Sequence, residues 1–110
     1  MSERRKYYSI AEIDITDQQW VAEYVKNVTP MVERYGGRYL TRTSHIEKLE
    51  GERTPPQLVV LVEWPSREVC DTFYQSEEYR PYRQSRAAGA RNEFLLVPAE
   101  DVARAARIGS

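Results

Sequence analysis

The stretch Leu58-Val59-Val60-Leu61-Val62-Glu63-Trp64 decides the fold, because it is apolar on both faces of an extended chain and is interrupted by a single charge. A strand that faces water on one side alternates apolar and polar residues, whereas a strand covered on both sides is continuously apolar. The stretch Phe94-Leu95-Leu96-Val97 has the same continuous character. Both stretches therefore predict strands of a sheet that is covered on both faces.

The segments around these strands alternate between the periods of strands and helices. Apolar residues recur at helical spacing from Trp20 to Tyr35, with Thr16 expected to cap this helix and Pro30 expected to kink or break it near Val28 and Thr29. In chain order, we expect a strand at 7–15, a helix at 20–35, a strand at 38–49, a turn at 50–56, a strand at 58–64, a helix capped by Ser66, a short helix from Pro81 toward Gly89, and a strand at 93–97.

This order of elements predicts an α+β fold of the ferredoxin-like βαββαβ type, with a four-stranded antiparallel sheet and both helices on one face. Residues 1–98 then form one domain, and residues 99–110 form a C-terminal tail that is helical or disordered. The second face of the sheet lacks a cover within the chain, although its strands are apolar there. We therefore expect a second copy to cover it across a two-fold axis, which makes the protein a homodimer.

The composition limits the classes of partner that the protein is expected to bind. The chain has 16 Lys and Arg against 17 Asp and Glu, for a net charge of −1, so no broad basic surface for nucleic acid or an anionic membrane is expected. The single Cys cannot form an internal disulfide, and no stretch approaches the roughly 18 apolar residues of a membrane span. The first residues lack the apolar segment of a secretory signal. These features predict a cytoplasmic protein that binds neither nucleic acid nor membrane.

Four motifs support a family assignment. They are Tyr-Gly-Gly-Arg-Tyr-Leu at 35–40, Leu-Glu-Gly at 49–51, Val-Val-Leu-Val-Glu-Trp-Pro-Ser-Arg-Glu at 59–68 and Phe-Tyr-Gln-Ser-Glu-Glu-Tyr at 73–79. In this order, and across Tyr7 to Pro98, the chain resembles domain of unknown function family 1330 of the dimeric alpha-beta barrel superfamily. The resemblance implies a homodimer whose two sheets enclose a small barrel cavity for a small molecule. Superfamily members include isomerases, cyclases, cofactor-free monooxygenases and haem enzymes, so the resemblance implies no single reaction.

Glu63 is the first candidate for chemistry, because it interrupts an apolar strand on the same face as Val59 and Leu61. A carboxylate in such surroundings is partly desolvated, which raises its pKa and suits it to be a general base or acid. The alternative is a buried ion pair with Arg38 or Arg42 on the neighbouring strand. We also expect Glu12 on the first strand, parallel and adjacent to the third. If Glu12 shares the face of Glu63, the two carboxylates push their pKa values apart.

The second strand carries two sets of candidates on opposite faces. Arg38 and Arg42 share one face, and Tyr39 and His45 share the other, unless a bulge mixes the two sets. The arginines would bind a carboxylate or an enolate-like ligand, whereas His45 would act as a proton shuttle.

On the second helix and the loop after it, Tyr74 and Tyr79 are candidates to line the mouth of the cavity, with packing as the alternative. The basic and aromatic cluster from Tyr79 to Arg86 is interpreted as a solvated face or a lid, and Cys70 as core filler. One His and one Cys, without CxxC or HExxH spacing, predict no metal site and no haem.

The sequence thus predicts a homodimer that binds a small molecule, and it leaves open whether the protein is an enzyme. One hypothesis is a cofactor-independent isomerase, cyclase or similar proton-transfer enzyme acting on a small organic acid or aromatic metabolite. The alternatives are a non-catalytic structural or ligand-binding dimer and a cofactor-free monooxygenase. The candidate catalytic residues are Glu63, Arg42 and His45, and the candidate ligand-binding residues are Arg38, Tyr39, Glu12, Tyr74 and Tyr79.

Overall fold

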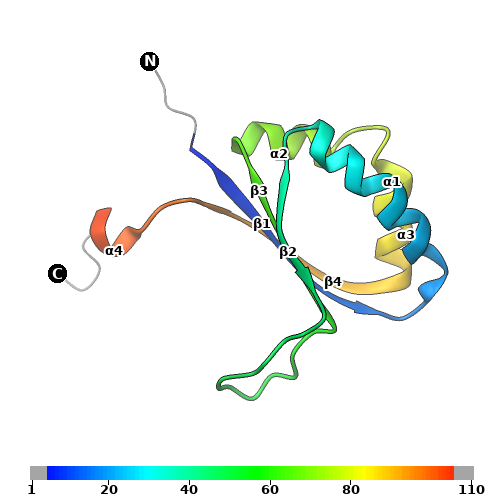
Figure 1. Ribbon diagram of the computed structural model, residues 1–110, viewed down its shortest axis with the longest axis horizontal. Coiled ribbons are helices and arrows are strands. Elements are labelled where there is room, and N and C mark those ends of the chain that lie inside the picture. The colour runs from blue at the N-terminus through cyan, green and yellow to red at the C-terminus, as the bar shows by residue number, and fades with distance from the viewer. Residues whose placement is uncertain (1–4, 106–110) are drawn as a thin grey trace.

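The computed structural model describes residues 5–105 and shows one antiparallel sheet with three helices stacked on one of its faces (Figure 1). The strands lie in the order β2-β3-β1-β4, as the ferredoxin-like prediction requires. The first strand is antiparallel to the third, so the expectation of a parallel pair is wrong. The strand bounds are β1 (Tyr7–Ile15), β2 (Arg38–Thr43), β3 (Leu58–Trp64) and β4 (Ala90–Pro98).

The first helical turn and the second helix begin at polar caps. Ser66 accepts a hydrogen bond from the backbone N–H of Val69 at 3.2 Å, as predicted for the second helix. At the first helix the cap is Asp17 rather than Thr16, because the Asp17 carboxylate accepts from the backbone N–H of Gln19 at 3.0 Å. The helix bounds are η1 (Gln18–Trp20, a 3₁₀ turn), α1 (Val21–Arg34), α2 (Arg67–Tyr74), α3 (Arg80–Gly89) and α4 (Val102–Ala105).

Two sequence expectations fail in the first half of the chain. Helix α1 continues through Pro30, so, of the expected kink or break, the break is wrong. The buried side chains around it, Val28, Met31 and Val32, pack into the core, and this packing outweighs the lost backbone hydrogen bond. Strand β2 ends at Thr43 rather than Leu49, because the Thr43 hydroxyl accepts from the backbone N–H of His45 at 2.9 Å and turns the chain away.

In the C-terminal tail, the residues up to Ala105 include the short helix α4, and residues 106–110 lie outside the described part of the chain. No helix in residues 5–105 is long and apolar enough to cross a membrane.

The core lies between the sheet and α1, α2 and α3. Alternate residues of β1 and β3 point into it, among them Ala11, Val62 and Trp64, each at most 5% exposed. The Trp64 ring stacks on Phe73 of α2 with 5.3 Å between ring centroids. Its indole N–H donates to the Ser9 hydroxyl at 3.0 Å, so the one buried polar group on this stretch of β1 has a partner.

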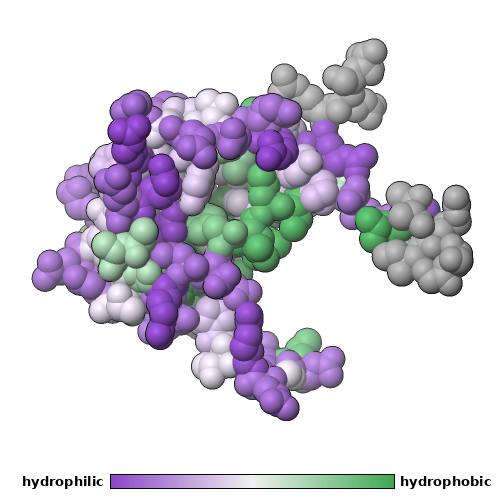
Figure 2. Space-filling model, turned by 180° about the vertical axis from the view of Figure 1, so that it is seen from behind, coloured by the Kyte–Doolittle hydropathy of each residue, from purple (hydrophilic) through white to green (hydrophobic). Residues whose placement is uncertain are grey.

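The opposite face of the sheet, called the open face here, is also apolar. It carries Tyr8, Ile10, Val59, Leu61, Leu95 and Val97, because these positions pair across the sheet on the side away from the helices. Leu95 is 56% exposed. Apolar residues gather over β4 and its neighbours in the middle of Figure 2. A single copy therefore leaves a continuous apolar surface in contact with water.

Candidate functional site

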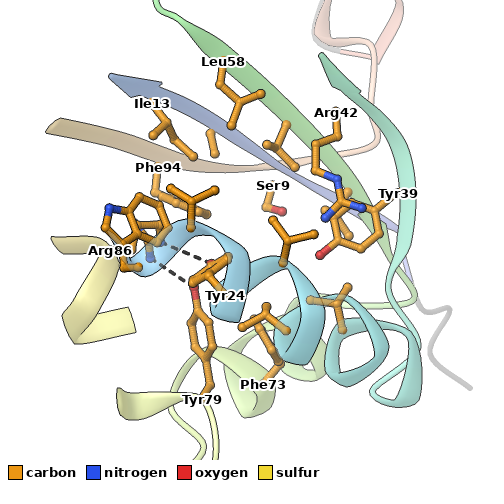
Figure 3. Close-up of a pocket in the computed structure, with 18 of the residues that line it drawn as sticks. Ser9, Ile13, Tyr24, Tyr39, Arg42, Leu58, Phe73, Tyr79, Arg86 and Phe94 are labelled. Atoms are coloured by element: carbon orange, nitrogen blue, oxygen red, sulfur yellow. Dashed lines mark hydrogen bonds between the residues drawn. The ribbon is translucent and has the colours of Figure 1, made fainter. Parts of the chain in front are cut away.

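A cavity of about 90 Å³ lies between the sheet and helices α1 and α3 (Figure 3). At about 30 Å³ for each water molecule, it has room for about three waters or a small organic molecule. This cavity lies on the helix side of the sheet and within one chain, whereas the sequence predicted a cavity between two copies. Its walls are mainly apolar and include Ala11, Ile13, Val28, Val60, Val62 and Phe94.

Three polar side chains converge at one end of the cavity. Tyr24 on α1 and Tyr79 just before α3 place their hydroxyl oxygens 2.6 Å apart. Arg86 on α3 donates from Nε to the Tyr24 oxygen at 3.3 Å and from Nη2 to the Tyr79 oxygen at 3.1 Å (Figure 3). Tyr79 is 1% exposed and Arg86 is 3% exposed. We call these three residues the polar cluster.

The protonation states of the polar cluster follow from its burial. Burial raises the pKa of the Tyr24 and Tyr79 hydroxyls above their ordinary value of 10.0, so both are neutral near pH 7. An arginine guanidinium is always protonated in proteins, so Arg86 is positively charged. Among residues 5–105, no carboxylate lies within 4.0 Å of it. Its charge instead faces the Phe94 ring, whose centroid is 4.3 Å from the guanidinium carbon.

The local sequence explains why Arg86 is buried. Tyr79, Tyr82 and Arg86 are spaced three and four residues apart, so they share one side of α3. The expectation of a solvated face is wrong for Tyr79 and Arg86, because this side of the helix packs against α1 and β4. The helical spacing of Arg86 with two tyrosines is the signal that could have identified Tyr79 and Arg86 as one buried group.

A second polar group, Arg42 with Tyr39 and Thr29, lies at the other end of the cavity. The Arg42 guanidinium carbon is 4.2 Å from the centroid of the Tyr39 ring, and Nη1 donates to the Thr29 hydroxyl at 2.9 Å. A bulge between Tyr39 and Thr41 turns both Tyr39 and Arg42 toward the helices. Burial also raises the pKa of Tyr39. The structure thus brings two of the predicted site residues together by the bulge that the sequence left open.

Glu63 lies on the open face, away from the cavity. Its carboxylate forms ion pairs with Arg38 at 3.0 Å and with Lys6 at 3.1 Å. Hydrogen bonds from Lys6 and Arg38 lower the pKa of Glu63, so the expected rise in this pKa is wrong. The alternative of an ion pair between Glu63 and Arg38 is confirmed.

The other predicted residues also lie outside the cavity, with Tyr79 as the exception. Glu12 shares the open face with Glu63 but pairs with Arg53 at 3.0 Å. His45 is exposed in the loop after β2. Tyr74 lines a neighbouring groove of about 250 Å³ next to β4, together with Cys70.

Sequence reasoning missed Tyr24, which lies inside the long apolar stripe of α1, and placed Arg86 on the surface. Burial raises the pKa of the Cys70 thiol to about 11, which keeps it protonated and agrees with its role as core filler. Within residues 5–105 there is no group of three or more His, Cys, Asp or Glu side chains placed to hold a metal ion.

Comparison with known proteins gives one family model and several similar solved structures, two of which are described below. The model of "Domain of unknown function (DUF1330)" matches residues 6–99. The RPA0582 protein of unknown function from Rhodopseudomonas palustris superposes with a TM-score of 0.76 at 15% identity, covering 90% of this chain and 85% of that one. SnoaB, a cofactor-independent oxygenase from Streptomyces nogalater, superposes with a TM-score of 0.61 at 13% identity, covering 88% of this chain and 95% of that one. The search of curated proteins found no significant match.

Proposed function

The chain belongs to the DUF1330 family, whose description names no activity, and we propose its function from the cavity. The protein binds a small organic molecule beneath α1 and α3 and catalyses proton transfer on it without a cofactor. The observation that carries this proposal is the convergence of Tyr24, Tyr79 and Arg86 on an otherwise apolar cavity. Small-molecule sites typically combine apolar walls with a few convergent polar groups.

The polar cluster suits the interconversion of an enol and its ketone. In this reaction one proton leaves the enol oxygen and one proton reaches the neighbouring carbon. Tyr24 and Tyr79 are hydrogen-bonded to each other, so one hydroxyl can donate its proton to carbon while the pair recovers a proton from the substrate oxygen. Arg86 donates to both hydroxyl oxygens and stabilises negative charge that develops during the exchange. At the other end, Arg42 and Tyr39 would hold the rest of the molecule.

A pair of variants tests whether binding occurs in this cavity. Ala11 is 2% exposed in the cavity wall, so Ala11→Leu fills part of the space, whereas Ala22→Leu makes the same change on the exposed side of α1. Small ketones and 2-oxo acids are screened by ligand-observed NMR. We expect Ala11→Leu to abolish binding and Ala22→Leu to retain it. Equal binding by both variants would place the ligand elsewhere and refute the proposal.

Proton transfer is measured separately, as exchange of the carbon-bound protons of the bound ketone with D₂O after dialysis against a chelator. We expect wild type to accelerate this exchange and Tyr79→Phe to lose the acceleration, because Phe keeps the ring and removes the hydroxyl. If ligands bind in the cavity but no exchange exceeds the uncatalysed rate, the protein is a binding protein rather than an enzyme.

We also propose that the functional unit is a homodimer joined through the open face. The support is the apolar character of that face, where Ile10, Leu61 and Leu95 lie side by side on three adjacent strands. A second copy of the same face would remove this surface from water, and a symmetric pair of sheets is a closed assembly. The cavity lies on the other side of the sheet, so this assembly does not cover it.

Oxygenation is the second candidate reaction, and the likeness to SnoaB is the observation that favours it. Such a reaction needs a substrate whose anion donates an electron to O₂, and the polar cluster would stabilise that anion. Oxygen uptake in the presence of small phenols tests this candidate. Uptake by wild type that is lost in Tyr79→Phe would favour oxygenation over simple proton transfer, and no uptake would exclude it for those phenols.

A further inference from the structure

We propose that the cavity selects a small organic anion, a short monocarboxylate, whose carboxylate is bound by Arg86 together with one tyrosine hydroxyl of the polar cluster. This inference rests on the proposed function, since it assumes that the ligand occupies this cavity. It adds the charge and the size of the ligand, which the proposed function leaves open.

The first argument is the unbalanced charge of Arg86. A guanidinium that is 3% exposed has lost most of its hydration, and charged groups are rarely buried unless they are paired. In the described part of the chain its partners are two neutral hydroxyls and two aromatic rings, those of Phe94 and Tyr24. Its place in the last turn of α3 offsets part of the unfavourable energy, because the C-terminal end of a helix favours cations. An anion in the adjacent cavity would supply the missing counter-charge.

The second argument comes from counting protons in the polar cluster. Tyr24 and Tyr79 have one hydroxyl proton each, and the hydrogen bond between them uses only one of the two. Arg86 only donates, so it cannot accept the other proton. Within residues 5–105 neither hydroxyl donates to any further group. One tyrosine O–H is therefore available to a ligand, and it requires an acceptor.

The third argument is the sign of the charge around the cavity. The charged side chains that line it are Arg42 and Arg86, both positive, with no Asp or Glu among the lining residues. The carboxylates of Glu12 and Glu63 lie on the opposite face of the sheet, where Arg53, Arg38 and Lys6 neutralise them. The field inside the cavity therefore favours negative ligands.

The volume sets the size of the ligand. A space of about 90 Å³ holds about three water molecules, which corresponds to an acid of only a few carbon atoms. Propanoate and propanamide have the same number of non-hydrogen atoms and nearly the same shape, but only propanoate carries a charge. The pair therefore separates recognition of charge from recognition of shape.

The experiment is an NMR titration of ¹⁵N-labelled protein with sodium propanoate and, separately, with propanamide at matched ionic strength. The indole N–H signals of Trp20 and Trp64 report on the cavity, because both rings line it. We expect propanoate to bind wild type at least about tenfold more tightly than propanamide, a difference of about 1.4 kcal/mol. Arg86→Gln should bring the ratio of the two affinities close to one.

Arg83→Gln is the matched control, because Arg83 lies one turn earlier on α3 and stacks over Tyr74 rather than lining the cavity. It should keep the preference for propanoate. Should Arg86→Gln fail to fold, the double variant Tyr24→Phe/Tyr79→Phe serves instead, since it removes both hydroxyls while the charge remains. It should weaken the affinity for propanoate several-fold, and propanoate should still bind more tightly than propanamide.

Three outcomes would overturn the inference. Equal affinity of the two probes for wild type would show that the cavity does not select an anion, while binding in the cavity, and hence the proposed function, would stand. A preference for propanoate that survives Arg86→Gln, or an affinity for propanoate that Tyr24→Phe/Tyr79→Phe leaves at full strength, would place the carboxylate elsewhere. If neither probe moves the indole signals while ketones still bind in a manner sensitive to Ala11→Leu, the ligand is a neutral molecule.

Discussion

Replacing Leu95 by Gln should shift the proposed dimer toward folded monomers. Leu95 lies on edge strand β4 and pairs with Ile10 on the open face, and 56% of its surface is exposed in a single copy. Complete burial of a leucine side chain stabilises by about 1.5–3 kcal/mol, so covering the exposed part of Leu95 contributes about 0.8–1.7 kcal/mol. A symmetric dimer contains two copies of the residue, and the total reaches about 2–3 kcal/mol.

This energy corresponds to a dissociation constant raised by about 30-fold to 150-fold, because each 1.4 kcal/mol is a factor of ten. Sedimentation velocity over a dilution series measures the constant directly. Circular dichroism and thermal melting of the same samples show whether the monomer remains folded.

Leu96→Gln is the control, since it makes the same change on the same strand. Leu96 pairs with Ser9 on the helix side of the sheet and is 37% exposed. It should leave the dissociation constant within a few-fold of wild type. A wild type that sediments as a monomer throughout the micromolar range, or a Leu96→Gln effect as large as that of Leu95→Gln, would refute the assignment of the open face as the interface.

Three further predictions concern stability and reactivity. Glu63→Gln should lower the melting temperature at neutral pH and flatten the loss of stability as the pH falls below 4.5, because a carboxyl whose pKa is lowered on folding stabilises only while ionised; an unchanged acid profile, or an equal effect from the exposed control Glu77→Gln, would contradict this. Gly89→Ala should destabilise by about 1–3 kcal/mol in thermal melting, because the new methyl group overlaps the Trp20 indole, which donates to the Gly89 carbonyl at 3.0 Å; a melting temperature equal to wild type would show that the ring moves freely. Cys70 should react with a thiol reagent at mildly alkaline pH only after denaturation, because burial raises its pKa to about 11; rapid labelling of the native protein would show that α2 opens locally.

Periodicity predicted most of the fold, because the strands and helices here obey simple patterns. The predicted bounds of β1 and β3 are those observed, and Ser66 caps α2 as expected. The end of β2 was not predictable from residue type, since it depends on a hydrogen bond from the backbone N–H of His45 to Thr43. The sequence predicts the bulge after Tyr39 only as an alternative, because a single inserted residue is not visible in the hydrophobic pattern.

The site was harder to predict than the fold, because a sequence shows which residues share a face but not which face encloses a cavity. Glu63 is a charge in an apolar strand, and the alternation of the strand correctly predicts that it shares a face with Val59 and Leu61. That parity places it opposite the helices, where it meets Arg38 rather than a ligand. Arg86 was overlooked because an arginine on a short helix is usually solvated, and only the packing of α3 against α1 and β4 buries it.

The charges of Glu63 and Arg86 indicate that the two faces of the sheet have different roles. Glu63 has two cationic partners within its own chain, so its negative charge is neutralised without a ligand or a second copy. Arg86 has no anionic partner within residues 5–105. It lines a cavity that also exposes a tyrosine hydroxyl proton without an acceptor. An ion-paired charge at the edge of an apolar face helps to fix the register of the strands and the association of two copies. An unpaired charge inside a cavity instead favours the binding of a ligand. It follows that substitutions at Glu63 and Arg86 should have separable effects, the first on stability and dimerisation and the second on ligand affinity. A variant of Glu63 that abolished ligand binding while the dimer stayed intact would break this separation.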